Sequence, residues 1–104
     1  MNVFDLNHLA QFDSTKPKAQ LVARSKHARQ ILFAFRVGQG LREHSTHSQI
    51  AAQVITGRLT FTAKGECQIL IPGQLLLLEA NVIHSMHTES DTVMLLTMTP
   101  DPQR

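Results

Sequence analysis

Two glycine-to-histidine spacings are the features of this sequence that could carry chemistry. Gly38-x5-His44 lies in the middle of the chain, and Gly73-x10-His84 lies towards its end. Each stands beside an alternating apolar pattern, which places the histidine on a strand close to a turn glycine. Imidazoles brought together from two distant strands could bind a metal ion, transfer a proton or hold a polar group of a ligand.

The parity of the neighbouring apolar residues decides which histidines face the core. His84 alternates with Met86, a residue suited to an apolar interior. His44 has the parity of three apolar residues that follow it: Ile50, Ala52 and Val54. Because alternate residues of a strand face the same side, we expect His44 and His84 to point into one interior.

His47 and His87 each follow one of these histidines by three residues, and residues three apart on a strand face opposite sides. We therefore read His87 as a surface residue. His47 would turn inward only if a β-bulge re-aimed it, and Gln49 or Gln53 would then lie nearby as a weak oxygen ligand.

The elements that must position these residues are short strands. Alternating runs begin at about residue 19, and turn signals separate them at short intervals. The pattern favours an all-β antiparallel barrel or sandwich of about nine to eleven strands, with hairpins over 53–62 and 68–78. Leu6 and Leu9 indicate a short N-terminal helix, whose continuation Pro17 opposes. We expect an N-terminal arm over 1–18 and one barrel domain over 19–104.

Composition excludes several partner classes. The chain of 104 residues has 17% charged residues and a net charge of +2, without the Trp and Tyr that a base-stacking surface would offer. We expect no nucleic-acid partner. Cys67 is the single cysteine, which rules out an internal disulfide and favours a reducing compartment. No signal peptide or membrane-spanning segment is recognisable, so we expect a cytoplasmic protein that does not bind membranes.

Two longer segments resemble the two motifs of the cupin superfamily. They read Gly38-x5-His44-x-Thr46-x3-Ile50-x6-Gly57 and Gly73-x5-Glu79-x-Asn81-x2-His84-x3-Thr88. The stretch between Gly57 and Gly73 is similar to the compact inter-motif region of small single-domain bacterial cupins. The resemblance covers roughly residues 30–100. It implies a cupin-type antiparallel β-barrel, also described as a double-stranded β-helix or jelly roll.

The resemblance also implies a divalent metal site, of Zn, Fe, Ni, Mn or Cu, inside the barrel. Cupins usually hold the metal with two histidines and a carboxylate or amide from the first motif and one histidine from the second. This chain keeps His44 and His84, whereas Thr46 takes the place of the second histidine and Ile50 that of the carboxylate or amide. The departures fall on the metal site itself.

Three arrangements remain open. A bulge could complete a metal site of His44, His47 and His84, or Thr46 could hydrogen-bond a metal-bound water. Alternatively, the barrel holds a metal-free cavity in which the histidines are polar handles. The residues expected to shape this cavity are Thr46, Gln49, Ile50, Ala52, Gln53, Val54 and Met86.

The functional expectation follows from these arrangements. The chain would bind a divalent metal, a small organic ligand or both, and would be an oxygenase or isomerase-like enzyme if the metal site is complete. The alternative is a metal-free binding or sensory barrel without catalysis. A third reading is a barrel that mainly supports a dimer. We expect a homodimer in any of these cases, with the apolar strands 31–37 and 93–98 as candidate surfaces.

Overall fold

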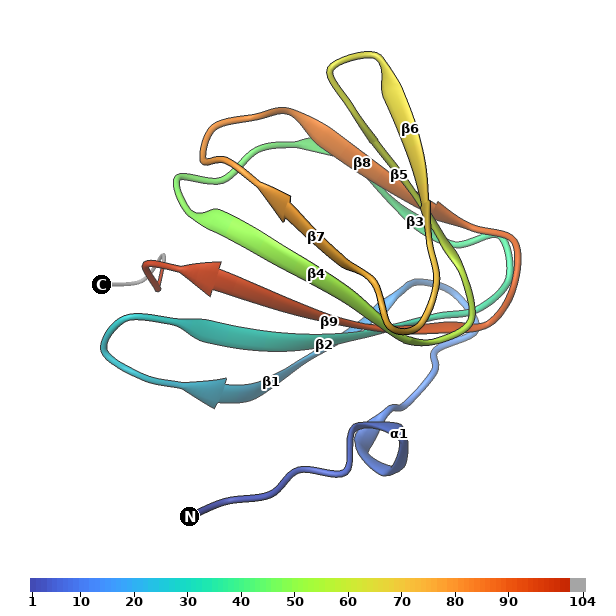
Figure 1. Ribbon diagram of the computed structural model, residues 1–104. Helices are drawn as coiled ribbons and strands as arrows, with labels where there is room; N and C mark the ends of the chain where they lie inside the picture. The colour runs from blue at the N-terminus through green and yellow to red at the C-terminus, as the bar shows by residue number, and fades with distance from the viewer. Residues whose placement is uncertain (102–104) are drawn as a thin grey trace.

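The alternating runs form nine β-strands within residues 1–101, the part of the chain that this computed structural model describes (Figure 1). In chain order these are β1 (Lys18–Arg24), β2 (Arg29–Phe35), β3 (Gly40–His44), β4 (Gln49–Thr56), β5 (Leu59–Ala63), β6 (Glu66–Leu70), β7 (Leu75–Leu78), β8 (His84–Thr88) and β9 (Thr92–Thr99). One short helix, α1 (Leu6–Leu9), precedes them. The expected all-β chain with a short N-terminal helix is confirmed.

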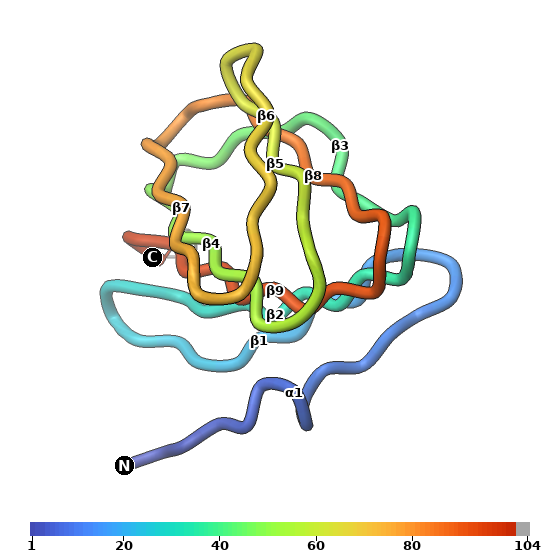
Figure 2. Tube along the Cα trace, turned by 45° about the vertical axis from the view of Figure 1, so that its right-hand side comes forward, coloured from blue at the N-terminus to red at the C-terminus, as the bar shows by residue number. Residues whose placement is uncertain are grey.

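The strands make two antiparallel sheets that face each other. One sheet has the order β1-β2-β9-β4-β7 and the other has the order β3-β8-β5-β6. Figure 2 shows how the two sheets enclose one interior, with the N-terminal arm and α1 outside it. No helix in the described residues is long and apolar enough to cross a membrane.

Consecutive strands mostly lie in different sheets, which corrects both predicted hairpins. β4 and β5 belong to different sheets, and so do β6 and β7, so neither 53–62 nor 68–78 is a hairpin. Turn signals show where the chain reverses but not which strand becomes its partner. Gly57, with φ of 88°, makes one of these crossings, and a Cβ there would collide with the Asp91 carbonyl. Among the described residues the hairpins are β1–β2 and β5–β6.

The core fills the space between the sheets. The inner face of β4 carries the predicted Ile50, Ala52 and Val54, all at most 3% exposed. Met86 meets them from β8. The other buried members of this cluster are Phe35, Leu59, Phe61, Leu70, Met94, Leu96 and Met98. Because burial alternates along β4, the period-two reading of this strand is confirmed.

Candidate functional site

His44 and His84 lie directly opposite each other on β3 and β8. Their ring centroids are 4.4 Å apart, and the ring planes make an angle of 56°. β3 can approach β8 closely because it begins with Gly40, where a Cβ would collide with the Met86 carbonyl. The register between the strands shifts between Leu41 and His44, and this irregularity sets the final pairing of the histidines.

Both imidazoles are held by the same kind of backbone contact. Nδ1 of His44 lies 2.8 Å from the carbonyl oxygen of Arg42, and Nδ1 of His84 lies 2.9 Å from that of Val82. A carbonyl oxygen only accepts, so each Nδ1 carries a hydrogen and each neutral ring keeps its lone pair on Nε2. Within residues 1–101 neither Nε2 has a hydrogen-bond partner. Each ring of this pair therefore offers one acceptor atom to a bound group.

The two rings differ in their surroundings. His84 is 3% exposed and stacks on Phe61, with ring centroids 5.3 Å apart and an angle of 8° between the planes. Burial lowers the pKa of His84 below its ordinary value of 6.5, and the nearby His44 lowers it further, against the opposing effect of the bond to Val82. His44 is exposed. At neutral pH, His84 is thus an uncharged acceptor inside the barrel wall.

The structure places the other expected metal ligands apart from this pair. His47 is exposed in the loop between β3 and β4, and its Nδ1 lies 2.8 Å from Oδ1 of Asn81. The Asn81 N–H in turn donates to the Thr46 carbonyl at 2.7 Å, which ties the two motif loops together. Residues 45–48 form a loop, so the alternation of inward and outward residues in β4 does not extend to His47 or His44. His47 stays with Asn81 at the surface.

The donor set of the described residues does not fit a resident divalent metal. Such sites use three or four protein ligands, and residues 1–101 contain no group of three His, Cys, Asp or Glu side chains that could hold an ion. The Thr46 hydroxyl donates to the Ser48 carbonyl at 3.0 Å, and Ile50 is 1% exposed within the core. Two imidazoles are left, one short of the smallest common set.

The residues expected to shape a cavity divide into two groups. Ile50, Ala52, Val54 and Met86 are buried and pack against one another, so they are core. Gln49 and Gln53 are exposed, because they occupy the outward positions of β4. The structure therefore corrects the expectation that either glutamine lies beside the histidines.

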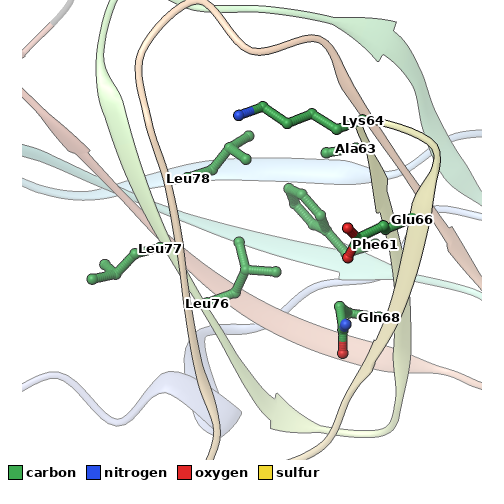
Figure 3. Close-up of a pocket in the computed structure, with 8 residues that line it drawn as sticks. All are labelled: Phe61, Ala63, Lys64, Glu66, Gln68, Leu76, Leu77 and Leu78. Carbon is green, nitrogen blue, oxygen red and sulfur yellow. The ribbon is translucent and has the colours of Figure 1, made fainter.

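A pocket that the sequence reasoning missed opens between the β5–β6 hairpin and β7 (Figure 3). Its volume is about 240 Å³, and Phe61 connects it to the histidine pair by lining the pocket with the ring that stacks on His84. The lining residues are Phe61, Ala63, Lys64, Glu66, Gln68, Leu76, Leu77 and Leu78. The alternate polar residues Glu66 and Gln68, which follow Lys64 and the turn glycine Gly65, are the sequence signal that could have revealed this wall.

Solved structures with the same architecture include three bacterial proteins. A protein from Thermus thermophilus is 25% identical, with a TM-score of 0.91 over 98% of this chain and 100% of its own. An RmlC-like cupin protein from Desulfovibrio desulfuricans is 23% identical, with a TM-score of 0.88 over 96% of this chain and 97% of its own. A cupin superfamily protein from Desulfitobacterium hafniense is 20% identical, with a TM-score of 0.86 over 96% and 92%.

Comparison at the level of sequence does not detect this similarity. No family model matches the chain, and no curated protein matches it. The similarity to solved structures nevertheless extends over nearly the whole chain and agrees with the two-sheet topology. The chain therefore has the fold of the RmlC-like cupins, the double-stranded β-helix that its motifs predict.

Proposed function

We propose that this chain is a small-molecule-binding cupin whose ligand docks on the His44–His84 pair. The observation that supports this best is the hydrogen-bonding pattern that the two rings share. Each Nδ1–H is taken up by a backbone carbonyl, so both Nε2 atoms are acceptors without a partner in residues 1–101. The complementary ligand is an uncharged small molecule with hydroxyl or N–H groups that donate to both acceptors.

The environment of the pair favours such a ligand. His84 is buried against Phe61, so a hydrogen bond to its Nε2 would form in partly desolvated surroundings, where it is stronger than in water. His44 is exposed and gives the ligand a way in. Binding sites of this kind combine apolar walls with a few fixed polar groups.

Catalysis and metal binding take a secondary place in this proposal. An uncharged His84 is suited to accept a proton at neutral pH, as the general base of an isomerase-like reaction would. No step is routed through a metal, because two imidazoles do not make a resident site. A bound divalent metal and a homodimer both stay predictions.

The test is a thermal-shift screen of small hydroxyl and amide compounds against chelator-treated protein. Compounds that bind only the folded chain raise the melting temperature, by the equivalent of about 2.7 kcal/mol at a hundredfold excess over Kd. We expect hits whose effect disappears in His84→Gln and weakens in His44→Gln. The matched control is His87→Gln, an exposed histidine on the same strand as His84.

Two outcomes would overturn the proposal. One is that no compound stabilises the protein unless a divalent metal is added, in which case the metal reading takes its place. The other is that the stabilising compounds act equally on the wild type and both site variants. Melting of each variant without ligand must first show a cooperative transition, so that a lost response is not confused with a lost fold.

A further inference from the structure

The pocket between the β5–β6 hairpin and β7 has one polar wall and one apolar wall. Glu66 and Gln68 line it from alternate positions of β6 that share one face, and Lys64 lines it from the turn of the hairpin. Leu76 and Leu78 line it from β7. Figure 3 shows the Glu66 carboxylate and the Gln68 amide turned into the space beside Phe61, with Lys64 extended across the opposite end.

The two charged groups are not engaged with each other. No ion pair or hydrogen bond within the described residues involves the side chain of Lys64 or of Glu66. Each lines the same pocket while keeping its charge available, so the pocket presents a positive and a negative group at separate points. A ligand with one charge would satisfy only half of this arrangement.

The hairpin backbone fixes where these groups start. Ala63 pairs with Glu66, and the two residues between them, Lys64 and Gly65, have φ of 52° and 74°. Positive φ at both turn residues is the geometry of the tight turns that match the twist of an antiparallel pair. Lys64 therefore leaves the backbone from the first residue of the turn, and Glu66 from the first residue of β6 after it.

The apolar wall and the floor complete the pocket. Phe61 is 2% exposed, so its ring is a fixed floor held from behind by His84. Leu76 and Leu78 are half-buried and pack against the core from the edge of the other sheet. An aliphatic group lying between them and Phe61 would lose contact with water on both sides.

We propose that this pocket binds a small apolar α-amino acid. The ligand carboxylate faces Lys64, its ammonium group faces Glu66, and its aliphatic side chain lies against Leu76, Leu78 and Phe61. A volume of about 240 Å³ suits a ligand of this size and is small for a nucleotide or a larger cofactor. Neither His44 nor His84 lines this pocket, although two of its lining residues, Phe61 and Ala63, neighbour His84. The proposal is additional to the function proposed above.

Isothermal titration with L-leucine tests the proposal directly. Three probes each lack one feature: 4-methylpentanoate has no ammonium group, 3-methylbutylamine has no carboxylate, and glycine has no aliphatic side chain. We expect saturable binding of leucine and at least about tenfold weaker binding of each other probe, which corresponds to about 1.4 kcal/mol. Equal binding of all four probes, or no binding of leucine, would overturn the proposal.

Variants then assign the binding to the pocket. Lys64→Met and Glu66→Gln should each weaken leucine binding by about tenfold or more. The matched controls are Lys26→Met and Glu89→Gln, exposed residues of the same types outside the pocket, and they should leave it unchanged. Loss of leucine binding in both control variants, as in the pocket variants, would contradict the assignment.

An NMR titration of the wild-type protein provides a measurement that needs no variant. Leucine should shift the amide signals of residues 61–68 and 76–78. Shifts centred on residues 44 and 84 instead would overturn the separate site. Leucine binding that survives in His84→Gln would support it, and this result is independent of the outcome at the histidine pair.

Discussion

The two strands β3 and β8 each carry a histidine of the pair, but they place it in different surroundings. His44 and His84 face each other, and each gives its Nδ1–H to a backbone carbonyl two residues earlier in the chain. His84 is nevertheless buried on Phe61, whereas His44 is exposed. The difference follows from position in the sheet, because β8 lies between β3 and β5, and β3 is an edge strand.

This comparison separates two roles within one pair. A residue on the central strand contributes to the core and to the site together, so it cannot change without a cost in stability. A residue on the edge strand contributes to the site with little effect on the core. We expect substitutions at His84 to affect folding and binding together, and substitutions at His44 to affect binding alone.

Removing the aromatic partner of His84 should have the largest effect. Phe61→Ala deletes a buried ring from the core and should lower the free energy of unfolding by about 3–5 kcal/mol. Urea denaturation followed by circular dichroism measures the change. Phe12→Ala in the half-exposed N-terminal arm is the control, with an expected loss well below that of Phe61→Ala. A loss of under about 1 kcal/mol for Phe61→Ala would mean that the ring is not part of the packed core.

Truncating each histidine compares the two strands directly. His84→Ala should cost about 2 kcal/mol, because it leaves a cavity beside Phe61. His44→Ala should cost less than about 0.5 kcal/mol, as is usual for an exposed side chain. The same denaturation assay gives both values. Equal losses of unfolding free energy in the two variants would show that the central and edge strands do not give His84 and His44 different roles in stability.

The smallest expected effect is a dependence of stability on pH. The pKa of His84 is lowered by burial in the folded protein from its ordinary value of 6.5, so the unfolded chain takes up the proton first as the pH falls. His84 therefore contributes stability above about pH 6.5 that is lost as the pH falls through that value towards the folded pKa. Melting temperatures measured between pH 8 and pH 5, at intervals of about one pH unit, test whether stability declines in this way.

The same titration in two variants identifies the group responsible. His84→Gln should show a smaller decline in melting temperature towards acidic pH than the wild type. His44→Gln should keep most of the decline, because the buried ring remains. A decline that is unchanged in His84→Gln would assign it to other groups.

Much of the strand arrangement could be predicted from local pattern. The alternation of Ile50, Ala52 and Val54 identifies the inner face of β4, and the parity of His84 and Met86 places both inside. These predictions hold because strand periodicity is a property of consecutive residues. The cupin resemblance adds the two-sheet architecture, which periodicity alone leaves as barrel or sandwich.

The remaining features depend on contacts between distant segments. Both predicted hairpins are wrong because a turn does not reveal which sheet the next strand joins. The alternation in β4 does not determine the orientation of His44, because the intervening residues 45–48 form a loop. The pocket beside Phe61 was missed because its walls come from hairpin β5–β6 and from β7, which lie in different sheets.

The place of β9 in its sheet has a consequence for the order of events during synthesis. β9 lies between β2 and β4, and it pairs along both. It is also the last strand of the described chain to leave the ribosome. The segments that form β2 and β4 must therefore wait, with their apolar faces uncovered, until residues 92–99 emerge between them. This sheet is therefore completed late in folding, and folding is slow for a sheet of this size, because its central pairings join residues far apart in sequence.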